Sequence, residues 1–342
     1  MKYFKLLLFF SFCFIFFISI SDAKSNSKNK DFILTNSGQT IKFKNLKYLK
    51  KEKDIPLVYF TKDITAESIL NIYKKLDFKP AGKVGLKISI GEPPKSNYLR
   101  PELLKSLISE LNANIVECNV IYPGRRMNTT MHLEVAKEHG FADVTNVDIL
   151  DSEGDISIPV RKGIILKENF IGTHFKNYSS YVVVSHFKGD KMSGFGGAIK
   201  NISIGFASSM GKKFIHTGGK SRTTWMGGDQ NEFCEAMADA GKAVSDYMNN
   251  GKNITYINVM NRLSVDCDCN GNPTEPDILD IGVLASNDPV ALDQACIDII
   301  SLAKGSKSLL ERIKNKNGLH TLESAEKNGL GKRNYYLIDI SK

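Results

Sequence analysis

Short β-type runs alternate with amphipathic helical patterns along most of the chain after residue 53. This alternation predicts an α/β fold, in which a mainly parallel sheet carries helices on both faces. Helix-start signals support the pattern, because Pro101 and the pair Asp288-Pro289 suit a first helical turn. We expect one α/β domain over residues 54–342, with two lobes around a cleft and a lobe boundary in Asp151–Gly154 or Gly218–Gln230.

The expected strands are Pro56–Phe60, Val84–Ile90, Asn114–Val120, Gly163–Lys167, Tyr181–Ser185, Tyr256–Met260, Ile281–Ala285 and Tyr335–Ile340. The expected helices are Ala66–Leu76, Pro101–Leu111, Thr130–His139, Ala198–Ser208, Asn231–Met248, Pro289–Ala303 and Thr321–Lys327. In open α/β sheets ligands bind beyond the carboxyl ends of the strands, so the segments that follow strands are the candidate sites.

The N-terminus has the composition of a secretory signal peptide. Lys2 and Lys5 precede a charge-free, mostly apolar stretch at Leu6–Ile20, and Ser21-Asp22-Ala23 supplies a small-x-small cleavage signature. We expect residues 1–23 to be removed and the protein to be exported to the periplasm or the extracellular space. An uncleaved N-terminal anchor is the alternative, since signal and anchor differ mainly in the length of the apolar stretch. No stable membrane span is expected after cleavage.

The net charge of +9 comes mostly from the N-terminal part of the chain. Residues 1–53 hold eleven of the 46 basic residues and three of the 37 acidic ones, which leaves the remainder at +1. No basic face is therefore needed to explain the charge, and nucleic acid is not an expected partner. Residues 24–53 are interpreted as a solvated, lysine-rich lead-in with one strand at Ile41–Phe43.

The segment after the strand Tyr181–Ser185 contains the densest group of chemically active side chains. It reads His186-Phe187-Lys188-Gly189-Asp190-Lys191-Met192-Ser193-Gly194-Phe195-Gly196-Gly197-Ala198-Ile199-Lys200-Asn201. Glycines allow close approach of the backbone to a ligand, and free N–H groups at the start of the following helix favour an anion. The segment matches neither the Walker pattern nor the dinucleotide fingerprint. The alternative to a functional site is a structural turn with solvated lysines.

These residues, with two arginines, make up the predicted site. We expect Lys200 in the first helical turn, and His216 at the end of a strand-like run at 212–216, to face one cleft and act on a bound anion or metal. Arg125 and Arg126 follow a glycine turn and suit recognition of a carboxylate or phosphate, although a surface role is equally open. The predicted catalytic residues are His186, Lys188, Asp190, Lys200 and His216; the predicted cofactor-binding residues are Gly194, Gly196, Gly197, Lys200, Asn201, Arg125 and Arg126.

Five cysteines follow the expected signal peptide, an odd number that leaves at least one thiol unpaired. Cys118 and Cys296 lie in apolar runs and are expected to be buried. Cys267 and Cys269 are separated by one residue, a spacing that we expect to be awkward for a mutual disulfide. With His216 they are the candidate ligands of a divalent metal, and a polar loop with free thiols is the alternative.

Several of these motifs resemble the domain of unknown function family 362, often labelled as iron–sulfur centre proteins. The resemblance rests on Gly91-Glu92, Tyr98–Pro101, Tyr122–Gly140, Ser185–Asn201, Gly211–His216, Cys267-Asp268-Cys269 and Ala285–Asp293. Many members carry ferredoxin-like cysteine runs after the position of His216. Here Cys234 is the one cysteine between His216 and Tyr256, so no [4Fe–4S] cluster is expected.

The same segment is more distantly similar to the lactate racemase family. That resemblance implies a lysine that covalently holds a nickel pincer nucleotide and a histidine sixteen residues later that ligates the nickel. Lys200 and His216 match in type and spacing, whereas Asp190 stands where the family has a catalytic histidine. An aspartate is a poorer proton carrier at neutral pH unless its pKa is raised.

Together these observations predict a metal- or anionic-cofactor-dependent enzyme acting on a small oxygenated substrate. The alternative is a non-catalytic exported protein that binds a ligand or metal in the same cleft. The expected partner in either case is a small-molecule or anionic ligand.

Overall fold

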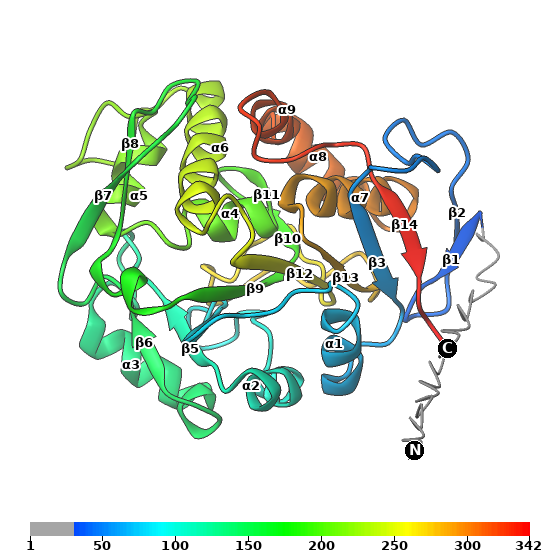
Figure 1. Ribbon diagram of the computed structural model, residues 1–342, viewed down its shortest axis with the longest axis horizontal. Helices are drawn as coiled ribbons and strands as arrows, with labels where there is room; N and C mark the ends of the chain where they lie inside the picture. The colour runs from blue at the N-terminus through cyan, green and yellow to red at the C-terminus, as the bar shows by residue number, and fades with distance from the viewer. Residues whose placement is uncertain (1–30) are drawn as a thin grey trace, which may run out of the picture. The chain divides into compact units, whose positions relative to one another are not determined.

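The computed structural model describes residues 31–342, so the expected signal peptide at residues 1–23 lies outside the described residues. In this part of the chain a sheet of eight strands has the order β14-β3-β13-β12-β9-β4-β5-β6 (Figure 1). The strands are β3 (Leu57–Thr61), β4 (Val84–Lys87), β5 (Asn114–Glu117), β6 (Val147–Ile149), β9 (Ser180–His186), β12 (Ile254–Met260), β13 (Gly282–Ser286) and β14 (Tyr336–Asp339).

The sheet is mainly parallel, as predicted. Within residues 31–342, β13 is the one strand of this sheet that pairs antiparallel with its neighbours, β12 and β3. The pairs β12–β9, β9–β4, β4–β5, β5–β6 and β14–β3 are all parallel. The carboxyl ends of β12, β9, β4, β5 and β6 therefore lie along one edge.

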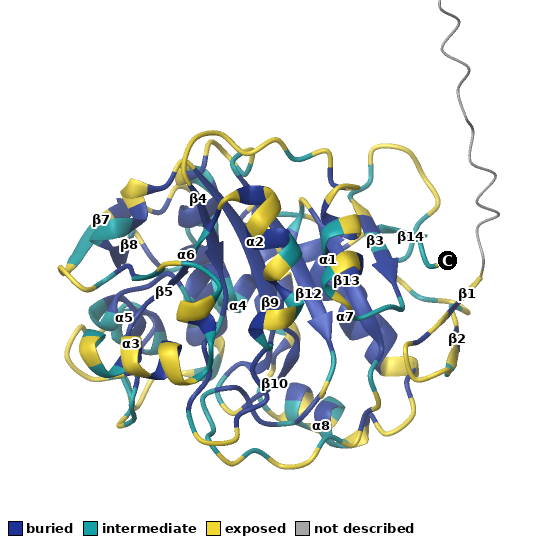
Figure 2. Ribbon diagram, turned by 90° about the horizontal axis from the view of Figure 1, so that it is seen from below, coloured by how far each residue is buried: buried dark blue, intermediate teal, exposed yellow. Residues whose placement is uncertain are grey.

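Helices cover both faces of the sheet. Successive residues of a strand point to opposite faces, so a strand that is apolar throughout has side chains to bury on each face. In β9, Val183 packs with the apolar side chains of one face, and Val182 and Val184 pack with those of the other. Figure 2 shows the strands as a buried layer between helices whose outer faces are exposed. This confirms the predicted α/β class.

One face packs against α1 (Ala66–Tyr73), α2 (Lys105–Leu111) and α3 (Thr129–Glu138). The other packs against α4 (Ala198–Ser203), α5 (Ser209–His216), α6 (Gln230–Tyr247), α7 (Pro289–Leu302), α8 (Lys307–Asn315) and α9 (Leu319–Lys327). Short 3-10 turns occupy Pro101–Leu103, Phe141–Asp143 and Thr173–Asn177.

Three two-stranded ribbons accompany the main sheet: β1 (Phe32–Leu34) with β2 (Thr40–Lys42), β7 (Asp155–Pro159) with β8 (Glu168–Gly172), and β10 (Lys188–Asp190) with β11 (Gly194–Gly196). The first ribbon corrects the expected solvated lead-in, because Ile33 and Ile41 are buried in the core. Residues 31–342 form one compact unit. No helix among them is both long and apolar enough to cross a membrane.

Two expected strands are absent from the described structure. Residues 163–167 form a bend, because the N–H groups of Ile164, Ile165 and Leu166 donate to the Asp239 carboxylate at 2.7–2.9 Å instead of to a neighbouring strand. The run 212–216 belongs to α5, whose first turn is capped by the side chain of Ser208. The expected helix 198–208 is shorter and ends at Ser203.

Candidate functional site

A cavity of about 440 Å³ opens at the carboxyl edge of the sheet. Lys87 ends β4, Glu117 ends β5 and His186 ends β9, and all three line the cavity. The connection from β4 to β5 runs through α2 on one face, and that from β9 to β12 runs through α4, α5 and α6 on the other. Neighbouring strands whose connections leave on opposite faces form the crevice where open α/β sheets bind ligands.

The hairpin β10–β11 brings Asp190 and Lys200 together in the cavity wall. The buried Asp190 carboxylate accepts hydrogen bonds from the N–H groups of Met192 and Ser193 at 2.9 and 2.8 Å, and its other oxygen forms an ion pair with Lys200. Burial alone would raise the pKa of Asp190, but Lys200 and these hydrogen bonds lower it to about 2. Asp190 is therefore ionised at pH 7. A carboxyl group that carries protons at neutral pH would need a raised pKa, whereas the pKa of Asp190 is lowered.

His186 and Lys188 converge on the buried Asp268. His186 Nδ1 lies 2.8 Å from one carboxylate oxygen, and Lys188 Nζ lies 2.8 Å from the other. His186 Nε2 donates to the carbonyl of Asn261 at 2.7 Å, so both ring nitrogens have protein partners. Burial would raise the pKa of Asp268, but His186 and Lys188 hold it below its ordinary value. Both ring nitrogens of His186 are therefore occupied by protein groups and are not free to contact a ligand.

His216 lies in the same cavity wall, at the last residue of α5. Its ring stacks on Phe233 with a centroid distance of 4.8 Å, and Nδ1 donates to the Lys212 carbonyl at 2.7 Å. Burial lowers the pKa of His216 to about 4, so the ring is neutral at pH 7. Because a carbonyl fixes the proton on Nδ1, Nε2 holds a lone pair that can accept a proton or bind a metal.

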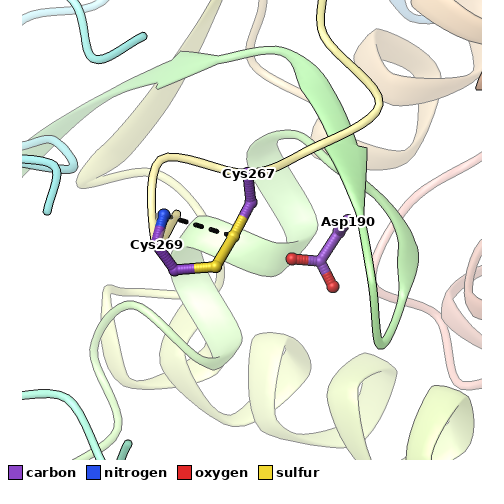
Figure 3. A group of neighbouring side chains, drawn as sticks. All are labelled: Asp190, Cys267 and Cys269. Atoms are coloured by element: carbon purple, nitrogen blue, oxygen red, sulfur yellow. Dashed lines mark hydrogen bonds between the residues drawn. A yellow bond between two sulfur atoms is a disulfide. The ribbon is translucent and has the colours of Figure 1, made fainter. Parts of the chain in front are cut away.

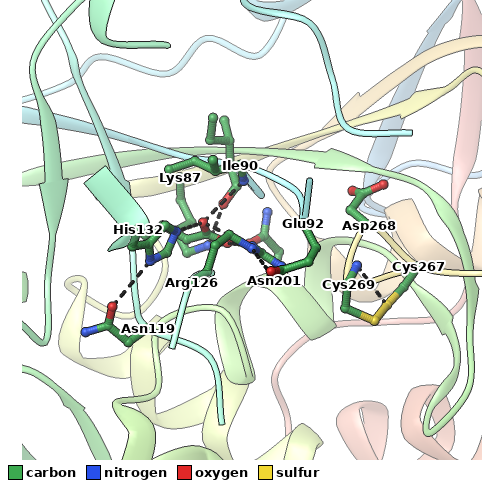
Figure 4. Close-up of polar contacts among 12 residues, drawn as sticks. Lys87, Ile90, Glu92, Asn119, Arg126, His132, Asn201, Cys267, Asp268 and Cys269 are labelled. Carbon is green, nitrogen blue, oxygen red and sulfur yellow. Dashed lines mark hydrogen bonds and ion pairs between the residues drawn. A yellow bond between two sulfur atoms is a disulfide. The ribbon is translucent and has the colours of Figure 1, made fainter. Parts of the chain in front are cut away.

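Figure 4 shows a second buried cluster, centred on Arg126. Its guanidinium contacts the Glu92 carboxylate at 3.1 Å, Glu117 at 3.3 Å and the Tyr122 hydroxyl at 2.5 Å. The other Glu117 oxygen lies 2.9 Å from Nε2 of the buried His132. Although burial would raise the pKa of Glu117, Arg126 and His132 keep it below the ordinary value. Arg126 lines the cavity with its charge already neutralised.

Arg125 does not share this position. Its side chain is 40% exposed and pairs with Glu138 at 2.7 Å on the surface of α3. Of the two arginines that the sequence singled out, the structure brings Arg126 to the cavity and leaves Arg125 outside its lining.

The cavity wall also contains Lys87 and Lys212, which sequence reasoning missed. Unlike Lys188, Lys200 and Arg126, these two lysines have no ion-pair partner among the described residues. They are 1% and 5% exposed. Lys87 Nζ donates to the Ile88 carbonyl at 2.7 Å and to Asn201 Oδ1 at 2.9 Å, and Lys212 Nζ donates to the Ala207 carbonyl at 2.6 Å. Among residues 31–342 neither amine forms an ion pair with a carboxylate. Burial lowers the pKa of Lys87 to about 8; the negative charge of Glu117 opposes this decrease, and the positive charge of Lys212 adds to it.

The N–H groups at the start of α4 are not free to bind an anion, contrary to the expectation from the sequence. The N–H groups of Ala198 and Ile199 donate to the carboxylate of Asp293 on α7 at 2.8 and 2.9 Å. A side chain at Gly197 would meet the same carboxylate, since its Cβ would lie 2.3 Å from Oδ1. The protein supplies its own anion there, and the glycines serve this packing.

The other predicted cofactor-binding residues divide between the cavity and the hairpin. Gly196, Lys200 and Asn201 line the cavity, and Asn201 orients Lys87. Gly194 is buried with φ +83° beside Ile313 of α8 and does not line the cavity.

Cys267 and Cys269 form a disulfide, which corrects the expectation from their spacing. Figure 3 shows the bond beside Asp190, and ligand atoms of these three residues lie within 4.8 Å of one another. His216, the third predicted metal ligand, is not part of this group. In the disulfide state the sulfurs are not thiolates, and the predicted metal set is not assembled. Cys118, Cys234 and Cys296 are buried free thiols.

Comparison with known proteins identifies a family and finds two solved structures that align at low scores. The profile described as "Domain of unknown function (DUF362)" matches residues 84–298. No curated protein sequence matches the chain. The lactate racemase apoprotein from Thermoanaerobacterium thermosaccharolyticum aligns at 16% identity and a TM-score of 0.36, covering 67% of this chain and 55% of that one. A crystal structure of a Thermotoga maritima protein aligns at 9% identity and 0.36, covering 77% and 58%. The chain thus spans little more than half the length of either structure.

Proposed function

Because the chain belongs to the family described as domain of unknown function DUF362, which assigns no activity, we propose a function from the cavity itself. We propose that the cavity binds a small oxygenated anion through Lys87 and Lys212, and that the protein is an enzyme acting on this anion or using it as a cofactor. The exported location stays a prediction from the N-terminal sequence.

The observation that carries the proposal is the pair of buried lysines without carboxylate partners. Removing an ammonium group from water costs several kcal/mol unless an opposite charge compensates it. Other cations of the wall have such compensation: Arg126 from Glu92 and Glu117, and Lys200 from Asp190. A carboxylate or phosphate group between Lys87 and Lys212 would supply the missing charge and form charge-assisted hydrogen bonds. The cavity volume suits a small molecule.

His216 favours an enzyme over a simple binding protein. It is neutral at pH 7, and its Nε2 lone pair is not engaged by the Lys212 carbonyl that holds Nδ1. A bound anion would make protonation of this ring easier, so His216 could accept a proton from the ligand. A non-catalytic binding protein is the alternative, and it would use the two lysines without any need for His216.

A covalently attached cofactor on Lys200, which the lactate racemase resemblance implied, does not fit this wall. The Lys200 amine forms an ion pair with the ionised, buried Asp190. An ammonium in an ion pair has no free lone pair with which to form a covalent bond. No step of the proposed function therefore involves such a group.

Isothermal titration calorimetry with inorganic phosphate and with glycolate, at low ionic strength and pH 7, tests the proposal. We expect saturable binding that Lys87→Met and Lys212→Met each weaken by about tenfold or more, because each removes one charged contact. Lys213→Met is the matched control, since Lys213 is the next residue and does not line the cavity. If neither anion binds at millimolar concentration, or if all three variants bind as the wild type does, the proposal is wrong.

A further inference from the structure

The Cys267–Cys269 disulfide lies in the cavity wall, yet none of the chemistry proposed above uses it. Its loop is fixed on both sides, because the N–H of Glu92 donates to the Asp268 carbonyl at 2.7 Å and the N–H of Gly189 donates to the Ser264 carbonyl at 2.8 Å. Gly189 permits the second contact, since a Cβ there would lie 2.3 Å from the Val265 carbonyl oxygen. The sulfurs are thus held at a defined position in the wall.

Cross-linking two residues that are only two positions apart restricts the unfolded chain very little. The stabilisation that a disulfide provides through chain entropy grows with the length of the loop that it closes. This bond closes nearly the shortest loop possible, so global stability is a weak reason for its presence. Its place in a cavity points to chemistry instead.

The two sulfurs are not equivalent. Cys267 is 4% exposed, whereas Cys269 is partly exposed. The backbone N–H of Cys269 donates to Sγ of Cys267 at 3.2 Å. In thiol–disulfide exchange the reacting thiolate attacks the accessible sulfur, and the bond breaks more easily when the departing sulfur is stabilised as an anion. Both features assign attack to Cys269 and departure to Cys267.

The charges around the disulfide favour an anionic reaction partner. Asp190 and Asp268, the carboxylates beside it, form ion pairs with Lys200 and with Lys188. Within residues 31–342 no carboxylate forms an ion pair with Lys87 or Lys212, and both lysines line the same cavity. The excess positive charge would attract an incoming thiolate and disfavour a metal cation.

We propose that Cys267–Cys269 is a thiol–disulfide exchange site for small anionic thiols. A thiolate attacks Sγ of Cys269 and forms a mixed disulfide, while the electron pair of the broken S–S bond leaves on Sγ of Cys267. A second thiolate attacks the sulfur of the bound thiol, which releases Cys269 as a thiolate and forms the disulfide of the small molecule. The protein gains two electrons, and the two thiols lose them. A small disulfide reverses both steps.

Reduction by thiols of different charge tests the proposal on the isolated full chain. The probes are 2-mercaptoethanesulfonate, 2-mercaptoethanol and cysteamine, which are anionic, neutral and cationic apart from the thiol. Rates are measured by iodoacetamide trapping and intact mass, normalised to thiolate concentration, and compared with rates on a Cys-Asp-Cys peptide disulfide. We expect the anionic probe to exceed the cationic probe by about tenfold or more at low salt, and the ratio to shrink at high salt.

Single variants test the assigned direction. With glutathione disulfide as the probe, Cys269 in Cys267→Ser should form a mixed disulfide at least about tenfold faster than Cys267 in Cys269→Ser, because Cys269 is the accessible sulfur. Buried Cys118, Cys234 and Cys296 should stay unmodified in both variants and serve as the internal control. Equal rates in the two variants would contradict the assignment.

Three results would overturn the proposal: no disulfide in the air-oxidised protein, faster reduction by cysteamine, or stoichiometric Zn²⁺ uptake by the reduced protein that blocks reoxidation by glutathione disulfide. The test is separate from that of the proposed function. Phosphate binding in a Cys267→Ser, Cys269→Ser double variant reports on the two lysines alone.

Discussion

Arg126 and Lys87 are both buried cations in the wall of one cavity, but the protein treats their charges differently. Arg126 contacts Glu92, Glu117 and the Tyr122 hydroxyl, so its charge is balanced within the fold. Lys87 donates to two neutral oxygens, the Ile88 carbonyl and the Asn201 amide, and forms no ion pair with a carboxylate of the described residues. A balanced buried charge holds a structure together, whereas an unbalanced one is maintained at a cost to stability.

This difference separates a scaffold from the proposed binding surface within a single cavity. The Arg126 cluster joins the end of β5 to α3 through Glu117 and His132, and it needs no ligand to be complete. On the proposed function, the Lys87–Lys212 side is completed by a bound anion. The comparison can therefore be tested by removing one charge from each side.

The largest expected effect is on the scaffold side. Arg126→Met leaves Glu92 and Glu117 buried without their cation and should lower the free energy of unfolding by about 3–5 kcal/mol. Arg125→Met is the matched control, because its 40% exposed ion pair should contribute about 1 kcal/mol or less. Urea unfolding measures both. Equal losses in the two variants would show that the Arg126 cluster is not the scaffold described here.

A smaller effect is expected for Lys87, and it depends on pH. Unfolded lysine keeps its proton up to its ordinary pKa of 10.5, whereas folded Lys87 releases it above about 8. Between these values the unfolded state binds more protons, so stability rises with pH. Relative to Lys87→Met, the wild type should gain about 1.4 kcal/mol per pH unit between pH 8 and 10.

Urea unfolding in a buffer free of oxyanions measures the slope for Lys87. Lys213→Met, the neighbour of Lys212 outside the cavity lining, should show no difference from the wild type in the same interval. A flat difference between wild type and Lys87→Met would mean that the ammonium is compensated in the folded protein, and the contrast with Arg126 would disappear.

The sequence predicted the sheet because its strands are long apolar runs between helical patterns. It also directed attention to the carboxyl edge where the cavity lies, because His186 was placed directly after a buried strand; in the structure His186 is the last residue of β9. It failed where distant residues decide the local structure: Asp239 on α6 takes the N–H groups of residues 164–166, and Asp293 on α7 occupies the start of α4. No local sequence pattern predicts either of these long-range contacts.

The sequence contains an indication for one of the two missed lysines, Lys87. Lys87 interrupts the apolar run Val84–Ile90, and a charged residue inside a buried parallel strand needs an explanation. Lys212 had none, because 212–216 was interpreted as strand-like and only the helix α5 aims its side chain toward the Ala207 carbonyl. The spacing of Cys267 and Cys269 indicates an awkward disulfide, and it does not reveal the turn at residues 268–269 that accompanies the bond.

Lys87 and Lys212 are proposed to form one anion site. Crystals of the protein soaked in selenate, measured at the selenium absorption edge, test this site most directly, because the anomalous signal locates the oxyanion without bias. We expect a selenate within hydrogen-bonding distance of both amine nitrogens, and its loss in Lys87→Met but not in Lys213→Met. Selenate found only at surface lysines, with the cavity free of anomalous signal, would contradict it.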